Sequence, residues 1–246
     1  MSTIQIGILF FIISLLSSFT GRGGGLIYLS VLIYFNGLSV ESKILSFILI
    51  IATSLPHINK ALKVIDKSIL KKILLPSLCT YFVMGTIHQS LNGALFIGIL
   101  FFIGISSLLY LWFPNRILTK ESNLLKEKTS LYSIFASGIN SYVGLSPSLL
   151  LIPFLSNQLN MDLKKAIPFL HFQNLIVVSA GLTSLLLSSD IINHPNYTRV
   201  GILIGAVFCG SYLGKLFLAK STAFQTKFIF TILSLLSLLL VIFSKH

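Results

Sequence analysis

Long apolar segments alternate with short polar ones along the whole chain, and most of the apolar segments approach the roughly 20 residues that a helix needs to cross a bilayer. Two of these segments are interrupted by a short break, which divides each of them into two pieces. The pattern predicts an all-α, polytopic integral membrane protein. The predicted helical segments are 4–20, 26–35, 44–55, 73–89, 91–113, 131–143, 149–155, 166–188, 200–219 and 228–243.

Composition agrees with a chain whose main partner is the lipid bilayer. Hydrophobic residues make up 54% of the chain, charged residues 10%, and the mean hydropathy is +0.93. Soluble domains carry about a quarter charged residues. The formal net charge is +12, but the lysines lie in short runs between apolar segments, as in cytoplasmic loops, rather than in one basic patch. The pattern therefore predicts a multi-pass membrane location and no nucleic-acid partner.

The two halves of the sequence follow one plan, a broken apolar segment followed by three spans. Laying Gly21 on Gly144 aligns the two breaks and also places Ser30 on Pro153. Internal duplication of this kind is common among transporters. We predict a first transmembrane repeat over residues 1–128 and a second over residues 129–246.

Loop charges assign the sides of the membrane. The basic segments 57–72, 114–130 and 220–227 are predicted to be cytoplasmic, whereas the uncharged or nearly neutral loops near Gln89 and at 190–199 are external. The second broken segment then begins and ends inside, and the first begins and ends outside. Each is predicted to be a re-entrant pair of half-helices, so the repeats are inverted. The alternative is one kinked crossing at each break, which gives eight spans and two parallel halves.

The first break carries a candidate anion site, and its residues are Gly21, Arg22, Gly23, Gly24 and Gly25. Glycine permits a tight turn and close approach of a ligand to the backbone. The half-helix that begins near Gly25 would present free amide groups and the positive end of its dipole. Arg22 can donate two parallel hydrogen bonds to an oxoanion or a carboxylate. The alternative for Arg22 is a position at the water interface.

The second break is Gly144-Leu145-Ser146-Pro147-Ser148, which uses other residues for a similar purpose. Ser146 is a good helix N-cap, Pro147 suits the first helical position, and Ser148 adds a hydroxyl donor. In an inverted pair the two half-helix N-termini would meet near the midplane of the membrane. Two positive dipole ends facing one cavity favour an anion over a cation.

Other polar residues in apolar segments are candidates for contact with a substrate. His171 and Asn174 are three residues apart and share a helix face. They could hydrogen-bond a substrate, and His171 could carry a proton. The alternative for both is polar contact between helices. We expect His57, between Pro56 and a lysine-rich segment, to lie at the membrane interface.

The first break, followed by Leu26, Ile27 and Ser30, is similar to the GxGGGxxxxP signature of the sulfite exporter (TauE/SafE) family, the 4-toluene sulfonate uptake permease-type membrane transporters. Residues 144–153 resemble a second copy of that signature. The resemblance implies transport of sulfite, thiosulfate, sulfoacetate or related organic anions, and a bacterial inner (plasma) membrane. The chain departs from the signature at Arg22, at Ser30, where proline is usual, and at residues 146–148, which replace the second triple glycine.

The functional hypothesis is a membrane transporter of small anions with no cofactor and no metal. The apolar segments contain no Asp or Glu, and the chain has no P-loop, metal-binding cluster or nucleophile motif, so an enzyme is not expected. The alternatives are an anion channel-like pore and a non-transporting membrane assembly or interaction subunit. The sequence leaves the oligomeric state open. The predicted substrate-binding residues are Gly21, Arg22, Gly23, Gly24, Gly25, Gly144, Ser146, Pro147, Ser148, His171 and Asn174.

Overall fold

A computed structural model describes residues 3–20, 24–64, 67–86, 93–113, 122–157, 161–188 and 197–243, and within them it contains helices and no strand. The all-α prediction is therefore confirmed. The helices are α1 (Thr3–Thr20), α2 (Gly25–Asn36), α3 (Val40–Ser54), the 3-10 turn η1 (Leu55–His57), α4 (Ile58–Val64), α5 (Lys67–Thr86), α6 (Gly93–Trp112), α7 (Ser122–Val143), α8 (Ser148–Asn157), α9 (Leu163–Ser188), α10 (Tyr197–Lys220) and α11 (Ala223–Ile242).

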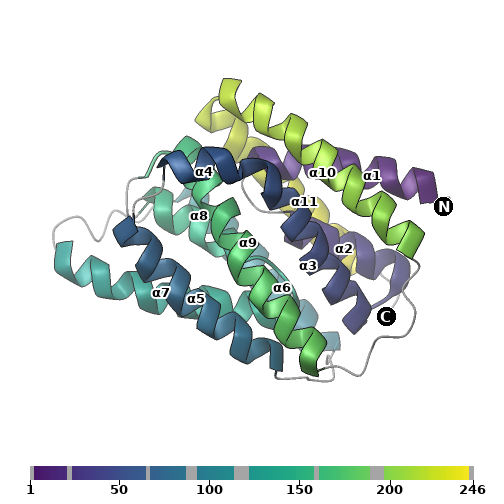
Figure 1. The fold of residues 1–246 in the computed structure, drawn as a ribbon, viewed down its shortest axis with the longest axis horizontal. Coiled ribbons are helices and arrows are strands. Elements are labelled where there is room, and N and C mark those ends of the chain that lie inside the picture. Colours follow the sequence, from purple (N-terminus) through teal and green to yellow (C-terminus); the bar gives the residue numbers. More distant parts are fainter. Residues whose placement is uncertain are drawn as a thin grey trace.

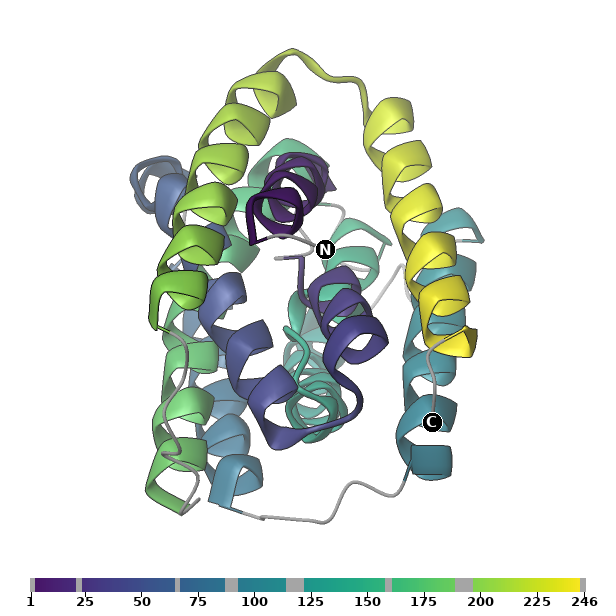
Figure 2. The same cartoon turned by 90° about the vertical axis from the view of Figure 1, so that its right-hand side faces the viewer.

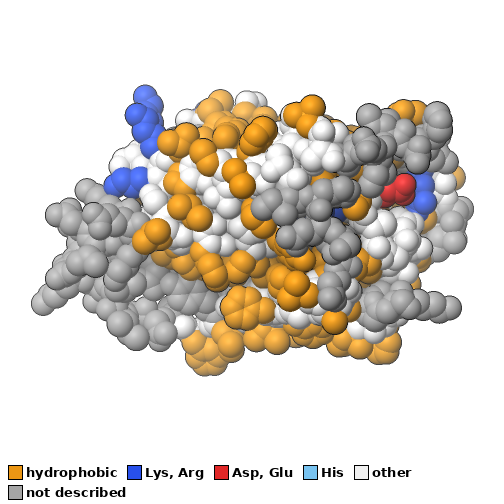
Figure 3. All heavy atoms as spheres, turned by 90° about the horizontal axis from the view of Figure 1, so that it is seen from below, with side chains coloured by type: hydrophobic (Ala, Val, Ile, Leu, Met, Phe, Trp, Pro, Cys, Tyr) orange, Lys and Arg blue, Asp and Glu red, His pale blue; other side chains and the backbone are white. Residues whose placement is uncertain are grey.

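Five helical segments of the described chain are long and apolar enough to cross a membrane, and the chain is a multi-pass membrane protein. Their outer faces expose large apolar side chains such as Leu75, Leu187 and Phe217. Figure 3 shows hydrophobic side chains across the middle of one face, with basic side chains toward its ends. This is the distribution that a lipid slab requires. The five segments are Val40–Val64, Lys67–Thr86, Leu163–Ser188, Tyr197–Lys220 and Ala223–Ile242.

Each break reverses the direction of the chain. For the first break, the direction of α1 follows from its contacts with α10. Ser14 Oγ donates to the Val207 carbonyl and Ser18 Oγ donates to the Ser211 carbonyl, so α1 runs parallel to α10. Helix α10 also runs parallel to α3, because residue numbers rise together along their contacts. Ser211 Oγ donates to the Thr53 carbonyl, and Lys215 Nζ donates to the Pro56 carbonyl. Helix α1 is therefore parallel to α3.

Helix α2 returns in the opposite sense. Its N-terminal Tyr28 donates to or accepts from Thr53, at the end of α3, over 2.7 Å, while Ser42 near the start of α3 bonds the Gly37 carbonyl just after α2. Helices α1 and α2 are consequently antiparallel. In the second half, the same reversal brings Tyr132 of α7 against Phe154 of α8, with their rings stacked at 4.3 Å.

The packing between the two halves repeats itself when the halves are exchanged. Helix α1 packs along α10 as α7 packs along α5, and α2 contacts α11 as α8 contacts α6. Helices α3 and α9, which hold corresponding places, contact each other antiparallel, since Ser54 meets His171 and Phe47 meets Gly181. Figure 1 shows α1 beside α10, and Figure 2 shows α1 and α2 between α10 on one side and α11 on the other.

Glycine allows α1 and α10 to approach closely. A Cβ atom added at Gly210 would overlap the Phe11 carbonyl oxygen, and one added at Gly214 would overlap the Leu15 carbonyl oxygen. The G-x-x-x-G spacing therefore serves backbone-to-backbone packing, as membrane helices commonly use it.

Two polar segments that the sequence predicts as loops are partly helical. Helix α7 begins at Ser122, inside the segment 114–130, and the segment 57–72 contains α4 and the start of α5. Lys and Glu are good helix formers, so a charge cluster ends the apolar span without ending the helix.

Candidate functional site

The two breaks lie against each other inside the bundle. Gly24, with φ of 72°, precedes α2, and Gly144, with φ of 86°, follows α7. A Cβ atom added at Gly25 would lie 3.1 Å from the backbone nitrogen of Ser146. The start of α2 therefore touches the residues that lead into α8. Gly21, Arg22 and Gly23 lie outside the described residues.

Side chains of α3 and α5 fix the backbone carbonyls of the second break. Ser46 Oγ donates to the Gly144 carbonyl over 3.0 Å, and the Tyr81 hydroxyl donates to the Leu145 carbonyl over 2.5 Å. Both donors are fully buried. Because these carbonyls point to α3 and α5, the negative ends of the local peptide dipoles are bonded away from the start of α8.

Ser146, Ser148 and Asn174 form a buried polar group at the start of α8. The Ser146 and Ser148 hydroxyls share a short hydrogen bond, and Asn174 Nδ2 donates to Ser148 Oγ over 3.2 Å. Helix α8 begins at Ser148, so Pro147 immediately precedes the first helical residue instead of occupying it. The structure thus brings Gly25, Ser146, Ser148 and Asn174 together.

His171 lies in a second buried polar group. Its ring stacks on that of His57 with centroids 3.9 Å apart and planes 12° apart. Ser54 Oγ lies 3.4 Å from His171 Nδ1, and Ser18 Oγ lies 2.6 Å from His57 Nε2. Both histidines have no solvent-exposed surface.

The His57 ring, which the sequence places at the membrane interface, is buried within the bundle. The residues around Pro56 form the turn η1, which carries His57 toward α9, and Lys215 Nζ of α10 donates to the Pro56 carbonyl over 2.7 Å. The following helix α4 exposes Leu62 and Lys63, whereas the turn directs the His57 ring inward.

A comparison with protein-family models gives one description, sulfite exporter TauE/SafE, which matches residues 6–241. The chain belongs to the sulfite exporter TauE/SafE family. The match covers nearly the whole sequence, so the resemblance inferred from the two breaks is confirmed. The TauE/SafE chain is thereby a membrane anion transporter. Neither the curated proteins nor the solved structures give a match.

Lys43 of the TauE/SafE chain is a buried cation that sequence reasoning missed. It is 8% exposed, its Nζ donates to the Tyr142 carbonyl over 3.0 Å, and its side chain packs on Gly144. Within the described residues it pairs with no carboxylate. Lys43 follows Glu41 in the first turns of α3, where a charged side chain normally marks a helix end, so only the packing of α7 reveals its burial.

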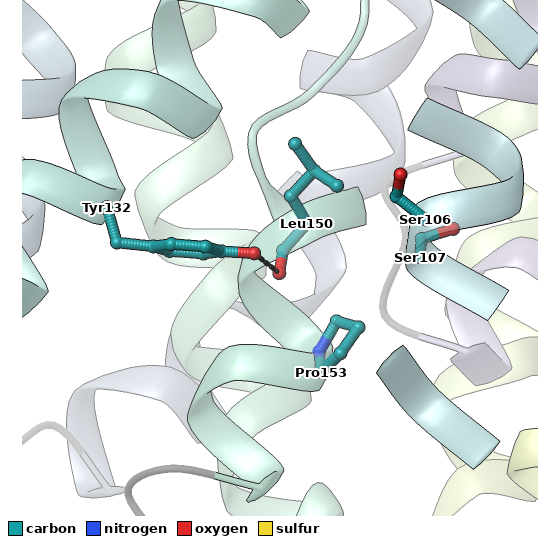
Figure 4. A pocket seen from close by; sticks show the side chains of 5 residues that line it. All are labelled: Ser106, Ser107, Tyr132, Leu150 and Pro153. Atoms are coloured by element: carbon teal, nitrogen blue, oxygen red, sulfur yellow. Dashed lines mark hydrogen bonds between the residues drawn. The ribbon is translucent and has the colours of Figure 1, made fainter. Parts of the chain in front are cut away.

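A separate pocket of about 260 Å³ lies beside α8 in this family member, between α6 and α7. Figure 4 shows Tyr132 and Leu150 on one side of the pocket, Ser106 and Ser107 on the other, and the Tyr132 hydroxyl bonded to the Leu150 carbonyl over 3.2 Å. The pocket borders the body of α8 and is mostly apolar, so it does not provide the polar contacts that an anion needs.

The described residues also include no group of three His, Cys, Asp or Glu side chains placed to hold a metal ion. Among the described residues, the buried polar side chains carry hydroxyls, amides, imidazoles and the Lys43 ammonium. These groups can donate hydrogen bonds to an anion.

Proposed function

We propose that the chain carries a small anion, such as sulfite, thiosulfate, a sulfonate or a related organic anion, which binds near the membrane midplane between the N-termini of α2 and α8. The contact between Gly25 and the Ser146 backbone is the observation that supports this most directly, because it brings two helix starts to one place. Helix N-termini are favourable sites for anions.

In this proposal residues 1–128 and 129–246 are inverted repeats, and each contributes one of the helix starts. The support is the exchange-symmetric packing of the halves and the antiparallel contact of α3 with α9. Rocking of one set of helices against the other would expose the site to each side in turn, as in other transporters with inverted repeats.

The proposed ligands combine backbone groups, neutral donors and one cation. Gly21, Gly23, Gly24 and Gly25 let the anion approach the backbone of the first break, as Gly144 does in the second. Ser146, Pro147 and Ser148 shape the start of α8, while Asn174 and His171 donate from α9. Arg22 supplies a charge-assisted pair of hydrogen bonds. The family resemblance also supports a bacterial inner membrane as the location.

Uptake into proteoliposomes tests the proposed function, with sulfite, thiosulfate, sulfate and a small sulfonate compared for the wild type, Arg22→Ala and Gly24→Leu. Hydrogen bonds to a charged group are worth about 1.5–3 kcal/mol, so Arg22→Ala should lower the rate at low anion concentration by about ten- to a hundredfold. Gly24→Leu should be at least as severe, because φ of 72° strains a branched residue and an added Cβ would overlap the Tyr28 ring.

Gly201→Ala is the matched control, since a Cβ atom there meets no atom within 4 Å. Equal flux in the wild type, Arg22→Ala and Gly24→Leu would rule out the proposed site. Counterflow of a preloaded anion separates a transporter from a channel-like pore, which shows none. A wild type without anion flux would leave the assembly-subunit alternative.

A further inference from the structure

The stacked pair His57 and His171 has two ring nitrogens that the protein does not use. His57 Nδ1 and His171 Nε2 are buried and make no hydrogen bond of full geometry in the described part of the chain. The other nitrogen of each ring contacts Ser18 or Ser54, and the Ser18 backbone also lies close to the His171 ring. Buried polar atoms in native proteins are almost always hydrogen-bonded. Two such atoms on titratable rings indicate a place where a proton or a polar ligand binds during function.

The charged groups that act on the pair within the described structure are basic. Lys60 of α4 and Lys215 of α10 are close enough to act electrostatically on His57, and Lys164 of α9 acts on Lys60 in turn. Tyr28, which reaches Thr53 beside the pair, is the neighbouring neutral titratable group. No carboxylate is paired with either ring among the described residues.

A proton added to either imidazole would thus create a buried positive charge near other positive charges, which is energetically costly. An anion beside the pair would offset that cost. If the bound anion raises the affinity of the pair for a proton, the bound proton must raise the affinity of the site for the anion by the same factor.

The pair lies next to the proposed anion site along α9. His171 precedes Asn174 by three residues on one helix face, a rise of about 4.5 Å, and Asn174 contacts Ser148 at the start of α8. Lys60 lies in α4, which directly follows His57, and Lys215 Nζ bonds the Pro56 carbonyl. Loop charges assign this end of the bundle to the cytoplasm. The pair therefore lies between the anion site and that membrane face.

We propose that the His57–His171 pair takes up one proton with each anion, so that transport is an anion–proton symport; this inference rests on the proposed function. On one side of the membrane a hydronium O–H bond breaks and an N–H bond forms on an unpartnered ring nitrogen while the anion binds. On the other side the N–H bond breaks, the proton returns to water, and the anion leaves. For a monoanion such as a sulfonate, the anion and the proton together carry no net charge, and one anion moves with one proton.

The experiment uses the full chain in proteoliposomes, with a small sulfonate as the probe because it remains ionised over the whole pH range and cannot itself carry the proton. The membrane potential is clamped with potassium and valinomycin, and a pH-sensitive dye reports protons in the lumen. An acid exterior should drive about tenfold accumulation of the sulfonate per pH unit, which is the limit for one-to-one coupling. Each sulfonate that enters should bring one proton.

The test variants replace both rings at once, as His57→Gln with His171→Gln and as His57→Asn with His171→Asn, and His246→Gln at the end of the sequence is the matched control. In both test variants we expect the number of protons per sulfonate to fall toward zero and the accumulation to be lost, with some downhill sulfonate flux remaining. Loss of structure alone would lower the proton and sulfonate fluxes together and leave their ratio near one. His246→Gln should keep both the ratio and the accumulation.

The outcomes separate the two proposals. Sulfonate flux without proton movement in the wild type would overturn the symport and leave the proposed function intact. A ratio near one in the test variants would overturn the role of this pair. If the wild type carries none of the tested anions, the proposed function fails and the symport fails with it. The wild-type proton measurement decides the question even if a variant does not insert.

Discussion

At the scale of single residues, Ser148 connects the second break to α9. Its hydroxyl accepts from Asn174 Nδ2 and shares a hydrogen bond with Ser146, and all three side chains are buried. In such surroundings the hydroxyl has two roles. It orients the amide of Asn174, and its own dipole can interact with a ligand at the start of α8.

Replacing Ser148 by alanine should weaken anion binding. The change leaves the buried Asn174 Nδ2 without its acceptor, and an unpaired buried donor costs about 1–3 kcal/mol. We expect the KM for anion uptake to rise about tenfold. The control is Ser30→Ala, since Ser30 Oγ bonds only the carbonyl of Leu26 in its own helix and should leave KM within about twofold. Matching KM values for the two variants would contradict this assignment of Ser148.

The residues of the two breaks can be predicted from the sequence. The burial of two neighbouring side chains, Lys43 and His57, cannot. Glycine runs and Ser-Pro-Ser inside apolar segments stand out because irregular backbone is tolerated at membrane depth only where protein or a polar cavity shelters it. Lys43 and His57 lie beside Glu41 and a lysine-rich helix, which indicate an interface. Their burial depends on α7, α9 and α10, which are distant in sequence.

At the scale of helices, the packing of α1 on α10 is the closest contact between the halves. Gly210 and Gly214 admit the α1 backbone, and Ser14 and Ser18 bond carbonyls of α10 in the same interface. Without a hydrophobic driving force between helices in lipid, such close packing and interhelical hydrogen bonds supply the association energy.

A large side chain at Gly210 should separate these two helices. In Gly210→Leu the side chain would collide with the α1 backbone at Phe11, and overpacking of this kind costs about 1–3 kcal/mol. Thermal unfolding in detergent should therefore begin several degrees lower than in the wild type. Gly205→Leu is the matched control on the same helix, where an added Cβ meets nothing within 4 Å. If both variants melt alike, the close packing is not a source of stability.

Helix positions follow from the sequence more reliably than helix ends. A long apolar segment in lipid must satisfy its backbone hydrogen bonds internally, which leaves the helix as the available form. The start of α7 at Ser122 is not signalled in this way, because the charged residues before the apolar part, Lys and Glu, are themselves good helix formers.

At the scale of the whole molecule, the two broken pairs determine which chain segments lie at the same end of the bundle. In the described structure α1 and α2 are antiparallel, so that the beginning of α1 and the end of α2 lie at one end of the bundle, and the beginning of α7 and the end of α8 lie at the other (Figure 1). A kinked crossing at each break would place the two ends of each pair on opposite faces.

Cysteine labelling in whole cells distinguishes these arrangements. In a background with Cys79 and Cys209 replaced by serine, an impermeant thiol reagent should label Ser2→Cys and Leu38→Cys from outside. Thr119→Cys and Asp162→Cys should react only after the membrane is made permeable. Opposite accessibility within either pair of variants would contradict the inverted arrangement and favour kinked crossings.

The lengthwise packing of α1 on α10 also bears on how the protein is made. The hydrogen bond between Ser14 and Val207 joins residues 193 positions apart, and the bond from Ser133 to the Ile73 carbonyl joins α7 to α5 across 60 positions. The ribosome must therefore synthesise most of the protein before its first helix meets the surface that receives it. A gene fragment that ends at residue 128 would yield a product lacking that surface, and assembly should be restored when the remaining fragment is supplied in the same cell.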